Sequence, residues 1–122
     1  IQADGGTRCA SITGGYVALW LACKKLVDEG VIAKMPLTGQ VSAVSAGIWE
    51  GEPILDLAYA EDSHAIVDAN FVMTEKAEFV EIQGTGEGRP FTKEELNKLM
   101  SLARRGTSKL CREQRKITGE IG

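Results

Sequence analysis

The segment Asp4-Gly5-Gly6-Thr7-Arg8-Cys9-Ala10 carries residue types suited to binding an anion. Its two glycines allow a tight turn and a close approach of the backbone to a ligand. Thr7 offers a hydroxyl and can cap the helix expected to follow, and Arg8 offers a fork of cationic N–H donors. Because free amides at a helix N-terminus also favour anions, Gly6, Thr7 and Arg8 are a candidate phosphate site. The same residues are equally compatible with an ordinary capped helix behind a glycine turn.

Two aspartates, Asp56 and Asp62, form the second candidate site. Asp56 interrupts the apolar run Ile54–Leu57, where an unpaired buried charge would be strongly destabilising. Asp62 follows six residues later and can return toward the same end of the sheet. Two carboxylates beside a phosphate site suit Mg²⁺, which uses one or two protein carboxylates and keeps several waters. The alternative is that Asp56 faces solvent from an edge strand and Asp62 caps a turn.

Three other features have less specific interpretations. The run Gly84–Gly88 has the spacing G-x-G-x-G rather than that of a dinucleotide fingerprint, so we interpret it as a flexible loop. His64, the single histidine, is close enough to Asp62 for acid–base work but is more typical of a surface residue. Trp49 precedes a turn signal and is a candidate interface residue.

The composition indicates an ordinary soluble domain. Of the 122 residues, 43% are hydrophobic and 25% charged, with a net charge of −3. Three cysteines without metal-like spacing indicate reduced thiols and a cytoplasmic location. Residues 93–122 carry 8 basic and 4 acidic residues, so this segment could meet a phosphate backbone, although a solvated helix face explains it as well.

Periodicity and turn signals predict a helix, four antiparallel strands and a second helix, which is an α+β fold with helices packed on a sheet. Trp20 is expected in the core on the broad apolar face of the first helix, and Gly14 and Gly15 are expected to mark close packing against the sheet. Thr92 and Glu95 predict a capping box. The expected elements are a helix at 8–29, hairpins at 40–48 with 53–59 and at 66–74 with 78–83, a loop at 84–90, and a helix from 92 to about 116.

Four ordered motifs resemble ribonuclease PH, and the bacterial enzyme more than exosome subunits. The segment 2–14 is similar to that family's phosphate-binding segment, and Leu55-Asp56-Leu57-Ala58-Tyr59-Ala60-Glu61-Asp62-Ser63 to its acidic strand. The segments 67–74 and 79–85 resemble the hairpin that follows. Ala58 departs from the pattern, because many relatives carry a polar or acidic residue there.

The resemblance implies a phosphorolytic enzyme that trims the 3′ end of RNA, notably tRNA precursors, with inorganic phosphate and releases nucleoside diphosphates. By motif, Gly6, Thr7 and Arg8 would hold the attacking phosphate. Asp56 and Asp62 would bind the metal, expected to be Mg²⁺, or act as general acid at the leaving oxygen. The alternative is a non-catalytic, exosome-type structural subunit that binds RNA.

The resemblance also implies a particular organisation. Residues 1–38 would end a first ribonuclease PH subdomain and 39–122 would form the second, as the C-terminal half of a longer chain. The family assembles as a hexameric ring of dimers, so we expect a homo-oligomer. The N-terminal half would bring a further phosphate-binding arginine and RNA-contacting strands, which leaves the active site of the present chain incomplete.

Overall fold

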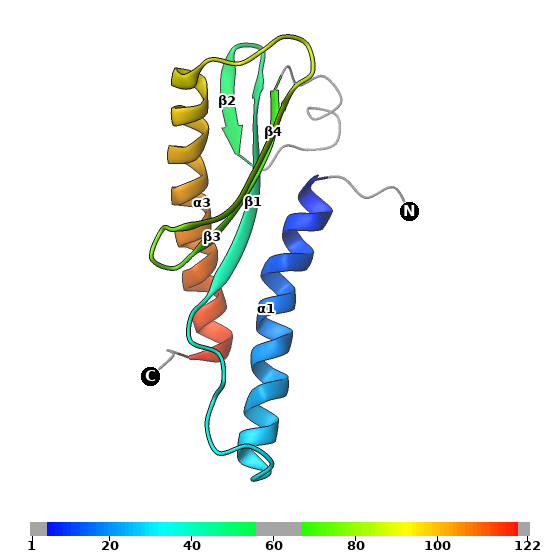
Figure 1. Cartoon of the computed structure of the whole chain (residues 1–122), viewed down its shortest axis with the longest axis vertical. Helices are drawn as coiled ribbons and strands as arrows, with labels where there is room; N and C mark the ends of the chain where they lie inside the picture. The colour runs from blue at the N-terminus through cyan, green and yellow to red at the C-terminus, as the bar shows by residue number, and fades with distance from the viewer. Residues whose placement is uncertain (1–4, 56–66, 120–122) are drawn as a thin grey trace.

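The predicted order of elements is confirmed. The computed structural model describes residues 5–55 and 67–119, and of residues 5–7 the backbone only. Within these residues the chain forms an α+β structure in which a helix is followed by two hairpins and another helix (Figure 1). The elements are α1 (Gly5–Asp28), β1 (Val41–Trp49), β2 (Glu52–Leu55), β3 (Val67–Thr74), β4 (Phe79–Gly86) and α3 (Lys93–Thr118).

The strands form one antiparallel sheet in the order β2-β1-β3-β4. The turn between β1 and β2 is built by Glu50 and Gly51, which both have positive φ angles of 51° and 78°. Two successive residues with positive φ give the turn whose twist matches that of a hairpin. In the second hairpin Ala77 has the positive φ. Strand β4 continues to Gly86. The loop was predicted to begin at residue 84, so its predicted first residue was wrong.

The two helices cover opposite faces of the sheet (Figure 1). Side chains alternate between the faces of a strand, so every second residue of β1 and β3 faces α3. These residues and α3 form the main core, which comprises Val44, Ala46, Ile48, Val67, Ala69, Phe71, Met73, Leu99 and Ala103. The face toward α1 has a smaller cluster of Cys9, Ala43 and Val72.

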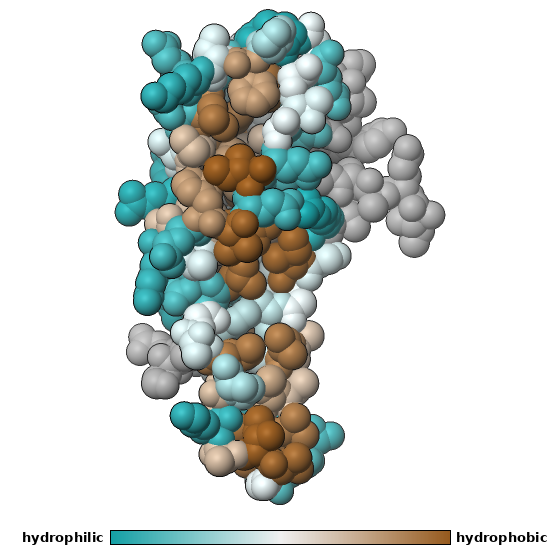
Figure 2. Space-filling view, viewed as in Figure 1, coloured by the Kyte–Doolittle hydropathy of each residue, from teal (hydrophilic) through white to brown (hydrophobic). Residues whose placement is uncertain are grey.

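α1 buries less of its apolar surface than its sequence predicts. Tyr16, Trp20 and Cys23 are buried, which confirms the core position of Trp20, but Leu19 is 52% and Leu26 38% exposed. The second half of α1 extends beyond the sheet, and Figure 2 shows hydrophobic residues gathered over that end of the molecule. Periodicity identifies the apolar face of a helix, but it does not say how much of that face the rest of the chain covers.

The predicted close packing of Gly14 and Gly15 was wrong. A Cβ atom added at either glycine would have no described atom within 4 Å. The close approach is at Gly106 of α3, where an added Cβ would lie 2.8 Å from Leu55 Cδ2 and 3.1 Å from Val44 Cγ1. Helix α3 can therefore lie directly on β1 and β2.

The start of α3 matches its prediction. The Thr92 hydroxyl accepts a hydrogen bond from the Glu95 amide at 3.1 Å, and the Glu95 carboxylate accepts one from the Thr92 amide at 2.9 Å. Arg89 adds two hydrogen bonds to the Glu95 carboxylate at this N-terminus.

Two further observations concern all the residues that the structure describes. The three cysteines are free and buried, and neither helix is long and apolar enough to cross a membrane.

Candidate anion site at the start of helix α1

The first turn of α1 differs from its prediction. The helix begins at Gly5, so Gly5 and Gly6 are helical rather than a turn, and Thr7 lies inside the first turn rather than at the N-cap. Glycine accepts helical angles as readily as turn angles, and the helix therefore extends back through both. The amides of Gly5, Gly6 and Thr7 still have no acceptor within the helix, as in every first turn. No acidic residue lies in this turn to neutralise the positive end of the helix dipole.

Arg8 is held against the edge strand β4. Its Nη2 donates a hydrogen bond to Glu81 Oε1 at 2.5 Å, and its Nη1 donates one to Gln83 Oε1 at 3.0 Å. The Arg8 and Glu81 side chains are 43% and 41% exposed, so solvent screens this ion pair but can still reach the guanidinium. The side chain of Arg8, the predicted phosphate-binding arginine, therefore points across one face of the sheet toward β4.

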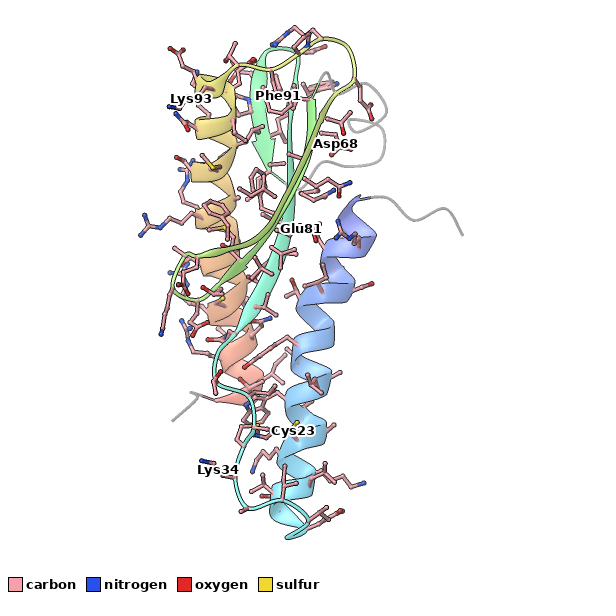
Figure 3. The ribbon with its side chains drawn as sticks, viewed as in Figure 1. Cys23, Lys34, Asp68, Glu81, Phe91 and Lys93 are labelled. Atoms are coloured by element: carbon pink, nitrogen blue, oxygen red, sulfur yellow. The ribbon has the colours of Figure 1, made fainter. Side chains whose placement is uncertain are left out.

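The register of the hairpin explains why Glu81 and Gln83 face α1. In an antiparallel pair, residues opposite each other point to the same face. Glu81 pairs with Val72 and Gln83 with Asn70. Val72 packs in the cluster with Cys9, and Asn70 Oδ1 accepts a hydrogen bond from Cys9 Sγ at 3.6 Å. Figure 3 shows Glu81 on the side of the strands where α1 begins.

Thr13 fixes α1 against β1. The described residues of β2 pair with β1 from Ala46 to Trp49, and α1 contacts β1 nearer its start. Thr13 Oγ1 accepts a hydrogen bond from the Ala43 amide at 3.0 Å and lies 3.4 Å from the Ala43 carbonyl oxygen. Gln114 of α3 bonds both the Val41 carbonyl and the Thr13 carbonyl, at 2.9 and 3.1 Å. Side chains of both helices thus bond the backbone at the start of β1, and Thr13 holds the first half of α1 against that strand.

The predicted carboxylate pair lies outside the described residues. Asp56 and Asp62, with His64, belong to the segment between β2 and β3. The structure describes the two residues that flank this segment: Leu55, which pairs with Ala46, and Val67, which pairs with Ile48. The convergence of Asp56 and Asp62 on Arg8 remains a prediction.

Sequence reasoning missed Glu81 and Gln83 as site residues. Their segment is predicted as the second strand of a hairpin, both by periodicity and by the family resemblance, and neither assigns the two residues to a site. A signal was available, since a glutamate and a glutamine two residues apart in a strand must share one face. Nothing in the sequence says that this face meets Arg8, which is 73 residues from Glu81 and 75 from Gln83.

Fold and site together define a class: an α+β domain whose sheet is covered by a helix on each face and carries an arginine beside a helix N-terminus. Residues 39–106 match the model of the 3′ exoribonuclease family, domain 2, and the chain belongs to that family.

Curated relatives agree with this assignment. The chain is 53% identical over 118 residues to the ribonuclease PH of Dehalococcoides mccartyi strain 195, and 52% identical to that of strain CBDB1. Each alignment covers 97% of this chain and 49% of the relative. The predicted resemblance to ribonuclease PH is confirmed, and the chain spans about half the length of these relatives.

Solved structures share the fold at low sequence identity. Rice Rrp46 superposes with a TM-score of 0.67 at 21% identity, over 98% of this chain and 51% of that one. An archaeal exosome core gives a TM-score of 0.55 at 17% identity, over 68% of this chain and 32% of that one. The Archaeoglobus fulgidus exosome with RNA bound to its active site gives 0.56 at 14% identity, over 71% and 35%. These similarities concern the fold alone.

Proposed function

We propose that this chain is the phosphate-binding half of a phosphorolytic 3′-to-5′ exoribonuclease. The enzyme would trim the 3′ end of tRNA precursors in the cytoplasm, with inorganic phosphate as co-substrate and nucleoside diphosphates as products. The observation that carries the proposal is the Arg8 guanidinium, held beside the first turn of α1 in a chain of the 3′ exoribonuclease family. The high identity to ribonuclease PH supports the same activity.

Gly6, Thr7 and Arg8 would bind the attacking phosphate. The first-turn amides point along the helix axis toward an anion, and the positive end of the dipole adds to the charge of Arg8. Phosphoryl transfer requires mainly in-line placement of the reactants and neutralisation of the charge that develops. A phosphate held between the amides and the guanidinium would satisfy both requirements on the side of the nucleophile.

Asp56 and Asp62 would serve the other side of the reaction. Two carboxylates are a donor set that fits Mg²⁺, which prefers oxygen ligands. When bound, the ion would supply positive charge at the reacting phosphate. One of the aspartates could instead deliver a proton to the leaving 3′ oxygen.

The RNA would be guided by the basic outer surface of α3. Exposed cations repeat along that helix, and a polyanion binds such a surface without sequence preference. We propose that the complete protein forms a homo-oligomer, as a hexameric trimer of dimers, and that the remaining half of the relatives' length adds further cations to the site. The exposed basic residues of α3 are Lys93, Lys98, Arg104, Arg105, Lys109, Arg112 and Lys116.

The test is phosphorolysis by a complete protein that contains this chain. Purified enzyme is incubated with 3′-extended tRNA and Mg²⁺, with and without phosphate, and the nucleoside diphosphates released are measured. The proposal expects release that depends on phosphate. Release of monophosphates without phosphate would indicate a hydrolase, and RNA binding without any release would indicate an exosome-type structural subunit.

Variants of the same protein test the residue assignments. Arg8→Ala should raise the phosphate KM strongly and leave the fold intact. Asp56→Asn or Asp62→Asn should each lower kcat by roughly 10²-fold or more, with little loss of RNA binding. A folded Arg8→Ala protein with an unchanged phosphate KM would remove Arg8 from the site, and aspartate variants with normal turnover would remove the carboxylate pair.

A further inference from the structure

We infer that Glu81 and Gln83 are positioning residues, which orient the Arg8 guanidinium so that it can receive phosphate. The inference rests on the proposed phosphate-binding role of Arg8 and deepens it. Its basis is the pair of hydrogen bonds from the two Nη atoms of Arg8 to the carboxylate of Glu81 and the amide oxygen of Gln83.

The two acceptors on β4 use only part of the donor capacity of the guanidinium. An arginine carries five N–H donors, two on each Nη and one on Nε. The bonds to Glu81 and Gln83 use one donor of each Nη atom, which leaves three of the five. Three donors are sufficient for a bidentate contact with a phosphate, so the acceptors and an anion can be bound together.

Both acceptors stand on a strand that is paired with its neighbour. Glu81 and Gln83 lie two residues apart on β4 and pair with Val72 and Asn70 of β3, and the register shifts just before Glu81. The residue next to Arg8, Cys9, is itself buried against β3 and bonds Asn70, the partner of Gln83. The backbone of Arg8 and both of its acceptors are therefore fixed to the same hairpin.

A held guanidinium binds an anion better than a free one. An arginine side chain loses rotational freedom when it binds a ligand, and an orientation set in advance reduces that loss. Glu81 also carries a negative charge, which weakens the attraction for phosphate. Orientation and charge thus act in opposite directions, and substitutions at Glu81 can separate them. Glu81→Gln keeps an acceptor oxygen and removes the charge, whereas Glu81→Ala removes both.

The experiment measures steady-state phosphorolysis by the complete enzyme, with phosphate and RNA varied separately. Glu81→Ala should raise the phosphate KM roughly three- to tenfold, because a solvent-exposed ion pair holds its partner only weakly. The kcat at saturating phosphate and the RNA KM should change by less than about twofold, and Glu81→Gln should restore the phosphate KM. Glu78→Ala is the matched control, since Glu78 lies just before β4 and bonds Thr74, not Arg8.

A double-mutant cycle decides whether Glu81 acts through Arg8. If it does, Arg8→Ala with Glu81→Ala should have the same phosphate KM as Arg8→Ala alone. Additive effects would overturn the inference, and so would parallel changes in the phosphate and RNA KM values, which indicate a merely structural role. If Glu81→Ala does not fold, Gln83→Ala replaces it and must raise the phosphate KM about twofold or more.

The outcomes separate this inference from the proposed function. An unchanged phosphate KM in Arg8→Ala refutes the phosphate site itself. A raised KM in Arg8→Ala with a normal KM in Glu81→Ala keeps the phosphate site and refutes the positioning role.

Discussion

At the scale of single residues, α1 contains two buried polar atoms that make no hydrogen bond within the part of the chain described by the structure. They are the hydroxyl of Tyr16 and the indole Nε1 of Trp20, one helical turn apart. Burial, more than any nearby charge, raises the pKa of the Tyr16 hydroxyl, which agrees with an apolar environment. Such a group lowers stability, because it has lost its bonds to water and gained none.

Removal of the Tyr16 hydroxyl should therefore stabilise the chain. We expect Tyr16→Phe to raise the free energy of unfolding by about 1 kcal/mol in urea denaturation. Thr13→Val is the matched control, since the Thr13 hydroxyl does bond Ala43 and its loss should destabilise by about 1 kcal/mol. A lower stability for Tyr16→Phe would mean that its hydroxyl has a partner.

The candidate site could be predicted from the sequence only in part. Arg8 stands in a local motif, so its residue type and its place near the start of an apolar helix could be predicted. The partners of Arg8 were not, because they come from β4 and meet it only through the register of the β3–β4 hairpin. Local patterns specify which residues share a face, whereas the packing of two elements decides which faces meet.

At the scale of elements, the glycines of the two helices have opposite roles. Gly15 has no described atom within 4 Å of an added Cβ, whereas Gly106 has Leu55 and Val44 there. Alanine favours a helix over glycine by about 1 kcal/mol. We expect Gly15→Ala to stabilise the chain by up to about 1 kcal/mol in urea unfolding. Gly106→Ala should destabilise it by about 1 kcal/mol, because overpacking exceeds the gain in propensity. Equal effects would contradict the close contact at Gly106.

The N-terminus of α3 should make stability depend on pH. The hydrogen bond from Arg89 is the main cause, and the one from the Thr92 amide the second, of a pKa of Glu95 that is lowered from its ordinary value of 4.5 to about 2. A lowered pKa gives stability that is complete above the unfolded value and is lost as the pH falls toward the folded one. The wild type should therefore have a higher thermal midpoint than Glu95→Gln at pH 7, with the difference shrinking between about pH 4.5 and pH 2.

A charge control accompanies this titration. Glu94→Gln removes a carboxylate from the same helical turn but leaves the capping box of Thr92 and Glu95 intact. It should lower the midpoint at pH 7 by less than Glu95→Gln does. A difference between wild type and Glu95→Gln that is constant from pH 7 to pH 2 would contradict the pKa assigned to Glu95.

The sequence predicted where the helices and strands lie better than it predicted which of their residues are buried. The capping box and both hairpin turns depend on a few neighbouring residues, and the structure has all three. The exposure of α1 depends on what lies beside it, and the described chain covers only part of that helix. The same limit explains why Gly14 and Gly15 were expected at a contact that is formed by Gly106.

At the scale of the whole molecule, exposed apolar residues indicate association. Leu19 and Leu26, seven residues apart on one face of α1, are 52% and 38% exposed, and Val31 in the turn after the helix is 66% exposed. Apolar patches of this kind mark interfaces in soluble proteins. We expect the 122-residue chain to self-associate, or to bind the remaining half of the relatives' length. Sedimentation should show a species heavier than 13.1 kDa. A stable monomer would contradict this expectation.

The patch can be tested by substitution. Leu19→Asp with Leu26→Asp should weaken the association, whereas Ser101→Asp, at an exposed position of α3, should leave it unchanged. Equal effects of the two changes would mean that the association depends on net charge rather than on the apolar surface of α1.

The last prediction concerns the activity of the chain by itself. Neutralising both an incoming and a scissile phosphate takes several cations, and of the cations in residues 1–62 only Arg8 lies at the proposed site. Lys24 and Lys25 lie near the far end of α1, and Lys34 follows in the turn beyond it. Loss of cationic contacts to a transition state lowers the rate by about 10²- to 10⁵-fold. The 122-residue chain alone should therefore trim 3′-extended tRNA far more slowly than a complete enzyme, with phosphate and Mg²⁺ present. Trimming at an equal rate would show that Arg8 and its surroundings suffice, and that the rest of the relatives' length is dispensable for the chemistry.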